Sequence, residues 1–319
     1  MKETDALLEA ARIVRDGGTV VFPTETVYGL GAHALDVRAV ARIFDIKNRP
    51  RFNPLIVHVS DLAGLDRIAA SVPPAAVKLA ERFWPGPLTL VLPKRAHVPD
   101  LVSAGLPTVA VRVPRHPLAQ ALLQAADVPI AAPSANRYTQ LSPTRVEHAK
   151  KQLGERVDFY LDGGPCEVGV ESTIVGWVAG RPTLLRRGGL ALEDIAECIG
   201  EIDPVPNTAR PLAPGNCERH YAPKTPLVFS EKPVVFSAPR KVALLALQPG
   251  EENASSYQKT AYLSHDGDLQ EAASQLFVKL HELESLGLDL IVARPLPNRG
   301  LGVAINDRLR RASQGATDL

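Results

Sequence analysis

The sequence predicts an α/β protein, in which a mixed sheet with flanking helices is followed by a smaller α/β domain. Three observations carry this prediction. The chain of 319 residues is long enough for two hydrophobic cores. Short apolar runs alternate with helix-length amphipathic segments over the first 190 residues, as in α/β folds. Six prolines between residues 201 and 226 interrupt this alternation before it resumes.

Apolar spacing and breaker residues define the elements of the first domain. Gly17-Gly18 ends the first helix, Asp36 is a suitable N-cap for the second, and Pro50 prevents that second helix from continuing. Helices are predicted at residues 6–15, 37–46, 74–83 and 116–125, and strands at 19–22, 55–59, 88–92, 108–113 and 130–132.

The proline-rich segment predicts an extended linker rather than a packed element, because proline fixes φ and removes a hydrogen-bond donor. A second α/β pattern follows, with strands at 241–247 and 288–293 and helices at 269–286 and 303–311. The predicted division is therefore a first domain at 1–190, a terminal helix and linker at 191–226, and a second domain at 227–319.

Charge and cysteine content exclude several classes of protein. A net charge of +1 gives no bulk attraction to nucleic acid or to a membrane, and no apolar run approaches the roughly 20 residues that span a bilayer. Residues 1–190 hold 23 Lys and Arg against 18 Asp and Glu, a surplus that fits a local anion site. Three scattered cysteines, without a CxxC pair or a secretory signal, predict a cytoplasmic protein without a zinc site.

The common catalytic signatures are missing. The sequence has no GxxxxGK[ST], no complete GxGxxG, no HExxH and no GxSxG. Any nucleotide must therefore bind in a less common cradle, and four polar clusters could build one.

The first cluster is Thr24-Glu25-Thr26 with Tyr28, directly after a buried strand. Polar groups at the end of a strand are typical of α/β ligand sites, although the hydroxyls could equally bond the local backbone.

The second cluster holds Lys47, Arg49 and Arg51, with Asn53 and His58 beyond. The rigid guanidinium of Arg49 suits a phosphate. The alternative is a solvated helix end whose cations oppose the helix dipole.

The third cluster surrounds Arg112, within the apolar run that starts at Thr108. An arginine facing inward from an apolar strand needs a partner. A ligand carboxylate or Glu25 would serve, and we favour the ligand.

The fourth cluster is Ser134, Asn136, Ser142 and Thr144, a donor-rich loop after a short strand. Its alternative is a turn that caps the next helix.

Weaker signals lie further along the chain. Ser172 follows a glycine-rich approach to a strand, and Arg186 ends the last strand of the first domain. Tyr221 has little local core to pack into, which predicts that it docks elsewhere. We expect structural roles for the histidines that lack ligand spacing, which are His33, His97, His116 and His148.

Pro23-Thr-Glu-Thr-Val-Tyr-Gly-Leu-Gly31, Lys47-x-Arg49 and Ser134-x-Asn136, taken together, resemble the YrdC-like family. The linker with His220-Tyr221-Ala-Pro and the second domain resemble the long, two-domain form of that family, which performs L-threonylcarbamoyladenylate synthesis. The resemblance implies a YrdC-like twisted mixed sheet, with a Rossmann-like C-terminal domain.

The resemblance also implies a reaction. L-Threonine, bicarbonate (or CO2) and ATP give threonylcarbamoyl-AMP and pyrophosphate, and downstream threonylcarbamoyl-transfer proteins use the product to modify tRNA. Mg²⁺ would accompany ATP, although no dedicated carboxylate pair for it is visible in the sequence. By this similarity the residues around threonine are Thr26, His58, Arg112, Ser134 and Ser172. Those around the nucleotide are Arg49, Asn53, Thr108, Asn136, Ser142, Arg186 and Tyr221.

Lys47 and Arg49 are expected to hold triphosphate oxygens while charge moves to the departing pyrophosphate. The linker with Tyr221 is expected to cover the site and exclude water. The competing hypotheses are an RNA-binding YrdC-like module without adenylylating activity, for which tRNA contact would be central, and a carbamoyl-transfer accessory.

Overall fold

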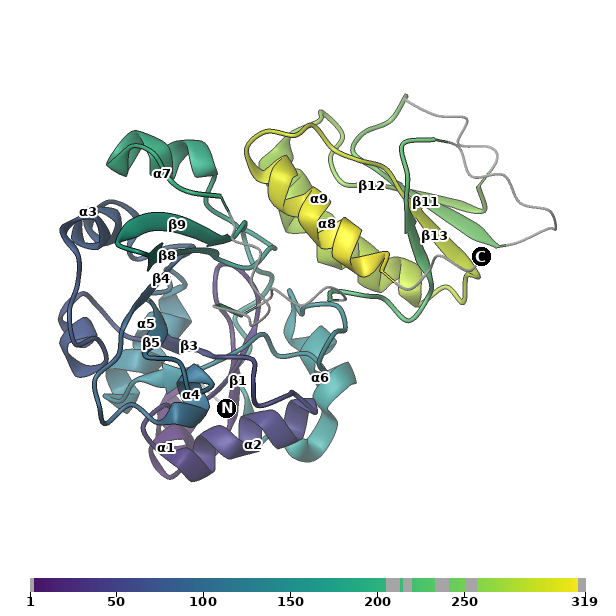
Figure 1. Ribbon diagram of the computed structural model, residues 1–319. Helices are drawn as coiled ribbons and strands as arrows, with labels where there is room; N and C mark the ends of the chain where they lie inside the picture. Colours follow the sequence, from purple (N-terminus) through teal and green to yellow (C-terminus); the bar gives the residue numbers. More distant parts are fainter. Residues whose placement is uncertain (1–2, 205–212, 215–219, 233–240, 251–256, 315–319) are drawn as a thin grey trace.

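The structure is a computed structural model that describes residues 3–204, 213–214, 220–232, 241–250 and 257–314. Its strands form two sheets, each flanked by helices (Figure 1). The first sheet has nine strands in the order β7-β1-β2-β6-β3-β5-β4-β8-β9, and the second has four in the order β10-β13-β11-β12. This arrangement confirms the predicted α/β class with a mixed sheet and a smaller second α/β unit.

The first unit contains, in chain order, α1 (Glu3–Arg15), β1 (Val20–Phe22), β2 (Gly29–His33), α2 (Val37–Lys47), β3 (Ile56–His58), η1 (Ala63–Arg67), α3 (Pro74–Phe83), β4 (Leu88–Pro93), α4 (Asp100–Ser103), β5 (Thr108–Arg112), α5 (Pro117–Ala126), β6 (Ile130–Ala131), α6 (Val146–Leu153), η2 (Gly154–Arg156), β7 (Phe159–Tyr160), β8 (Thr173–Val178), β9 (Arg181–Arg186) and α7 (Leu192–Ile199). The second contains β10 (Leu227–Phe229), β11 (Val242–Ala246), β12 (Lys259–Tyr262), α8 (Leu269–Glu284), β13 (Leu290–Ala293) and α9 (Leu301–Ala312).

The two faces of the large sheet bury different helices. Val21 of β1 belongs to the apolar cluster that also contains residues of α2, α3, α6 and α7, whereas its neighbours Val20 and Phe22 belong to the cluster with residues of α1 and α5. Side chains alternate between faces along a strand, so these two cores lie on opposite sides of the sheet. On the α1–α5 side, Ile56 of β3 and Ala110 of β5 pack with Ala213 of the linker. Linker residues therefore cover that part of the sheet.

The small sheet is parallel, and α8 and α9 lie between it and the first unit (Figure 1). Val27, Leu141 and Val170 of the first unit share one apolar cluster with residues of α8 and α9. The two units are thus joined by a common core rather than by a polar contact alone.

The helices agree closely with the sequence prediction, including the Asp36 N-cap, which accepts from the backbone N–H groups of Arg38 and Ala39. Four of the described strands were not predicted, namely β2, β7, β10 and β12. The glycines of β2 resemble a turn, while β7, β10 and β12 are short. The prediction of an extended linker that does not pack is wrong for the linker residues that the structure describes, because Ala213 and Tyr221 are fully buried. Pro206 and Pro211 lie outside the described residues.

No described helix combines the length and apolar character that a membrane span requires.

Gly169 is where the first unit meets the backbone of α8. Its φ is +74°, and a Cβ there would lie 2.4 Å from the Cα of Ser274. Gly169→Ala is expected to lower the free energy of unfolding by about 1–3 kcal/mol, because the two units must move apart. Chemical denaturation measures this change. Gly180→Ala is the control, since φ is +79° there and a Cβ would meet open space. An equal decrease in the free energy of unfolding in both variants would contradict a tight approach of the two units at Gly169.

Candidate active site

A crevice lies over the sheet face that the linker partly covers. Eight of the sequence-predicted site residues line it, and each comes from a different strand or loop of the chain. They are Thr26, Arg49, His58, Arg112, Ser134, Ser172, Arg186 and Tyr221. The predicted convergence of distant segments on one crevice is therefore present in the structure.

Strand pairing brings His58 and Arg112 together. The parallel strands β3 and β5 place these two residues directly opposite each other. Each is the last residue of its strand, and Val57 and Val111 point into the helix-covered core on the other face. Two polar side chains are thereby delivered to the same edge of the crevice.

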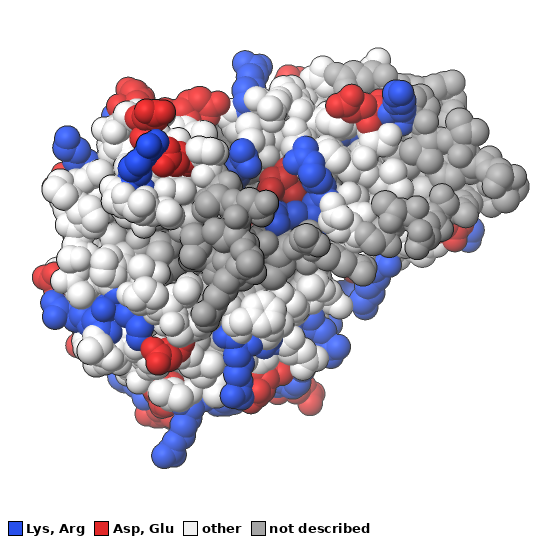
Figure 2. All heavy atoms as spheres, viewed as in Figure 1, with Lys and Arg blue, Asp and Glu red and all other residues white. Residues whose placement is uncertain are grey.

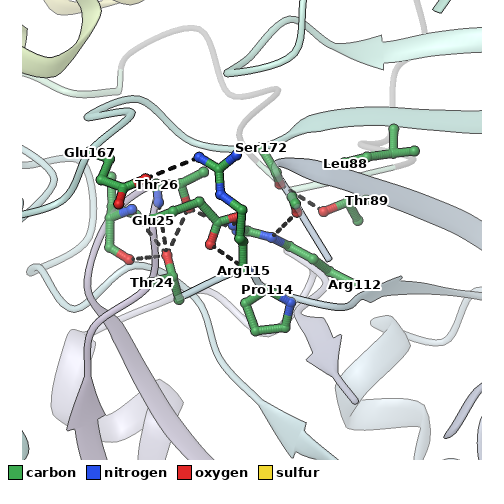
Figure 3. A network of polar contacts seen from close by, with 12 residues as sticks. Thr24, Glu25, Thr26, Leu88, Thr89, Arg112, Pro114, Arg115, Glu167 and Ser172 are labelled. Atoms are coloured by element: carbon green, nitrogen blue, oxygen red, sulfur yellow. Dashed lines mark hydrogen bonds and ion pairs between the residues drawn. The ribbon is translucent and has the colours of Figure 1, made fainter. Parts of the chain in front are cut away.

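Arg112 is paired with Glu25, and both side chains are buried (Figure 3). Nη2 of Arg112 lies 2.7 Å from Oε1 of Glu25, while Nη1 donates to the Thr26 hydroxyl at 2.8 Å. The backbone N–H of Arg115 donates to the other Glu25 oxygen. Of the two partners weighed for Arg112, the structure shows Glu25. Because Arg112 also lines the crevice, it can still receive an anion beside this pair.

Ser172 and Arg186 form a second polar group on the crevice wall. Nη2 of Arg186 donates to the carbonyl and hydroxyl oxygens of Ser172, and Nη1 donates to the carbonyl of Pro214. The Ser172 hydroxyl also bonds that of Thr89 at 2.7 Å. Arg186 therefore connects the first unit to the linker.

Arg49 is held by the loop that follows it. Its Nη2 donates to the carbonyl of Pro54 at 2.9 Å and its Nε to the carbonyl of Asn53 at 3.3 Å. The guanidinium carbon lies 6.0 Å from the ring centre of Tyr138. These contacts fix the direction of a cation on the crevice wall.

Lys47 is placed differently from the prediction that it contacts a triphosphate. Its ammonium group is buried behind the crevice and donates to the carbonyls of Ser134 (2.5 Å) and Asn136. Burial, with a smaller contribution from Arg49, lowers the pKa of Lys47 well below its usual range. Lys47 thus fixes the loop that presents the Ser134 hydroxyl.

The remaining predicted residues lie around the crevice rather than on its wall. Asn53, Asn136 and Ser142 are buried beside it. Thr108 is four residues before Arg112 on β5, so it lies on the same face about 13 Å away.

Several buried polar atoms of the crevice have no hydrogen-bond partner among the described residues. They include Nδ1 of His58, Nδ1 of His220 and the hydroxyl of Tyr221. Burial and the nearby Arg112 lower the pKa of His58 to about 3, so its imidazole is neutral at pH 7. Buried polar groups are normally satisfied, and these therefore point to a polar ligand.

The sequence analysis missed Glu171 as a site residue and missed Arg308 entirely. Glu171 lines the crevice and forms a buried ion pair with Arg308 of α9. One signal was available, because Arg308 interrupts the apolar stripe formed by Ile305, Leu309 and Ala312. An arginine in such a stripe requires a buried partner.

His148, for which a structural role was expected, lies at the contact between the two units. It stacks on His281 of α8, with ring centres 3.9 Å apart.

Carboxylates do not gather into a metal site in the described part of the chain. No group of three His, Cys, Asp or Glu side chains there could hold a metal ion. The crevice carboxylate of Glu171 and the adjacent one of Glu25 both face arginines.

Comparisons with known proteins agree with this arrangement. Residues 12–188 match the Sua5/YciO/YrdC family model, described as "Telomere recombination". Residues 190–314 match the model of the threonylcarbamoyl-AMP synthase C-terminal domain.

Curated relatives and a solved structure extend over nearly the whole chain. The threonylcarbamoyl-AMP synthase of Pyrococcus abyssi is 43% identical, over 95% of this chain and 93% of its own length. The Bacillus subtilis enzyme of the same name is 40% identical, over 97% of this chain and 93% of its own length. The crystal structure of P. abyssi Sua5 complexed with L-threonine superposes with a TM-score of 0.89, at 40% identity, covering 98% of this chain and 95% of that one.

The neutral state of His58 makes a prediction about acid stability. Its pKa is about 3 when folded and near 6.5 when unfolded, so between these values the unfolded chain binds more protons. Stability therefore falls as the pH drops below about 6.5, by up to about 1.4 kcal/mol per pH unit from this group. In His58→Gln this contribution is absent, so the slope of unfolding free energy against pH between pH 4 and 6 is expected to be smaller by up to about 1.4 kcal/mol per pH unit. His97→Gln, at an exposed position, is the control. An unchanged slope in His58→Gln would contradict burial of a neutral imidazole.

Proposed function

The chain belongs to the Sua5/YciO/YrdC family, and we propose that its crevice joins L-threonine, bicarbonate or CO2, and ATP into threonylcarbamoyl-AMP and pyrophosphate. This makes the protein a nucleotidyltransferase of the threonylcarbamoyl-AMP synthase type. The observation that carries the proposal is the set of three guanidinium groups, hydroxyls and a neutral imidazole on one crevice wall. Such a wall suits two anionic substrates that must be held against each other.

We assign the amino acid to the end of the crevice formed by β3 and β5. Arg112 would receive the threonine carboxylate, with the hydroxyls of Thr26, Ser134 and Ser172 nearby. The ion pair with Glu25 holds the Arg112 guanidinium in place before the substrate arrives. The unpaired Nδ1 of His58 can accept a hydrogen bond from the amino group.

We assign the nucleotide to the side of Arg49, Arg186 and Tyr221. Asn53, Thr108, Asn136 and Ser142, which surround this side, would complete the nucleotide site. Arg49 is the proposed catalytic cation, because a fixed guanidinium can stabilise the charge that develops on the departing pyrophosphate. Lys47 would act through the loop of Ser134 and Asn136 that it holds.

The chemical step needs no side-chain nucleophile. The threonine amine adds to CO2, losing a proton and forming a carbamate. A carbamate oxygen then attacks the α-phosphorus of ATP, and the bond to the β-phosphate oxygen breaks, releasing pyrophosphate. The carbamate decomposes in water, so the burial of His220 and Tyr221 over the crevice would protect it.

Mg²⁺ is proposed to arrive on the ATP phosphates, since Glu25 and Glu171 already face arginines. The product would pass to threonylcarbamoyl-transfer proteins that act on tRNA, and we place the reaction in the cytoplasm. In this scheme residues 1–190 provide most of the site, and 191–226 and 227–319 close and support it.

The described part of the face shown in Figure 2 gives no reason to prefer the RNA-binding alternative. Lys and Arg are interspersed with Asp and Glu over the face shown in Figure 2. A nucleic-acid groove would be expected to carry a basic stripe with aromatic side chains.

Pyrophosphate release tests the proposed reaction. Release should require ATP, threonine and bicarbonate together, because the carbamate is the nucleophile. Substantial release without threonine would contradict the proposal. Tight, salt-sensitive binding of tRNA by a chain that releases no pyrophosphate would instead support the RNA-binding alternative.

Arg49→Met tests the catalytic cation. It is expected to lower kcat/KM for pyrophosphate release by about 100-fold or more, since a preorganised charge is lost from the transition state. Arg51→Met is the matched control, because Arg51 is exposed and only two residues away. Near-normal kcat/KM in Arg49→Met would remove this residue from the mechanism.

A further inference from the structure

We propose that Arg308, from the C-terminal unit, is a positioning residue for the nucleotide side of the active site. This inference rests on the proposed function and assigns to α9 a part in it.

Arg308 reaches the first unit through a buried guanidinium. Its side chain is 1% exposed. Nε donates to Oε2 of Glu171 at 2.7 Å, and Nη2 donates to the carbonyl of Arg187 at 2.9 Å. Nη1 bonds Asp307, its neighbour on α9. Arg308 thereby contacts two segments of the crevice wall that are 16 residues apart in sequence.

The contact with Glu171 continues to Ser142. The Ser142 hydroxyl donates to Oε1 of Glu171 at 2.5 Å, while Oε2 of the same carboxylate is taken by Arg308. Burial alone would raise the pKa of Glu171, but Arg308 and Arg186 hold it below its usual range. The carboxylate is thus ionised and fixed at both oxygens.

A second contact from the same unit reaches Ser142. Nε2 of His281, on α8, lies 3.2 Å from the Ser142 carbonyl. The C-terminal unit therefore fixes Ser142 at its backbone through α8 and at its hydroxyl through Arg308 and Glu171.

Arg308 also supports Tyr221. The guanidinium carbon lies 4.6 Å from the centre of the Tyr221 ring, within the range of a cation–π contact. On another side, Tyr221 packs against Phe277 of α8, with ring centres 5.9 Å apart. The orientation of this linker residue over the crevice thus depends on the C-terminal unit.

The threonine side has different supports. Arg112 bonds Gly86, Thr26 and Glu25, all in the first unit. Arg308 instead holds Glu171, Tyr221 and the backbone beside Arg186. Removing Arg308 should therefore affect ATP more than threonine.

The test uses Arg308→Met in the full chain, which keeps the length of the side chain but removes its charge and its donors. We expect KM for ATP to rise about 10- to 100-fold, as is typical when a reactant loses its positioning, with KM for threonine within about twofold of wild type. In Arg308→Lys, KM for ATP should lie between the wild-type and Arg308→Met values. An ammonium can pair with Glu171, but it cannot also reach Arg187 and cover the Tyr221 ring.

Two controls separate positioning from general destabilisation. Arg310→Met places the same substitution on an exposed site of the same helix, where both KM values should be unchanged. Should Arg308→Met fail to fold, Glu171→Gln removes the same ion pair from the other side and should give the same ATP-selective defect. Equal rises in both KM values, or no change in either with an intact fold, would overturn the proposal.

A binding measurement keeps this test independent of the proposed reaction. Calorimetric titration of wild type and Arg308→Met with ATP, and separately with L-threonine, needs no turnover; we expect the variant to lose affinity for ATP but not for threonine. A wild-type chain that binds ATP but releases no pyrophosphate would refute the proposed function, while the Arg308 comparison would still be decided.

Discussion

The buried ion pair of Arg112 and Glu25 is the interaction around which the crevice is arranged. A guanidinium on the crevice face of β5 cannot remain there without an anionic partner, and removing one member of such a pair typically costs about 3–5 kcal/mol. Glu25 reaches Arg112 from the loop between β1 and β2. In the sheet, β6 and β3 lie between β2 and the strand of Arg112, β5. The pair therefore fixes that loop, with the Thr26 hydroxyl, against the strand edge where His58 also ends.

The same principle operates twice more around the site. Arg186 is held by Ser172 and the linker carbonyl of Pro214, and Arg308 by Glu171 and the carbonyl of Arg187. In each case a buried guanidinium joins segments that the chain order keeps apart. The shared core containing Val27 and Val170 brings α8 and α9 close enough for the last of these contacts. The C-terminal unit thus supports residues of the crevice wall from behind, through Arg308 and its contacts with Glu171 and Arg187.

Much of this arrangement was predictable from sequence, because it follows from local patterns. Helix periodicity, the Asp36 cap and strand alternation located most elements, and the requirement that Arg112 have a partner identified Glu25 as one of two candidates. What failed depended on distant contacts. Nothing near Lys47 indicates that its ammonium turns to the carbonyls of Ser134 and Asn136, and nothing near Glu171 indicates an arginine 137 residues away. The linker was expected to be extended because proline disfavours regular structure, yet Ala213 and Tyr221 pack tightly without any.

One measurement tests the central claim most directly, which is that these arginines hold an amino acid and a triphosphate against each other. It is a crystal structure with L-threonine and a non-hydrolysable ATP analogue bound together. The account predicts the threonine carboxylate on Arg112 and the triphosphate beside Arg49, with the amino group facing the α-phosphorus. Either ligand bound outside this crevice, or the two bound too far apart to react, would contradict it.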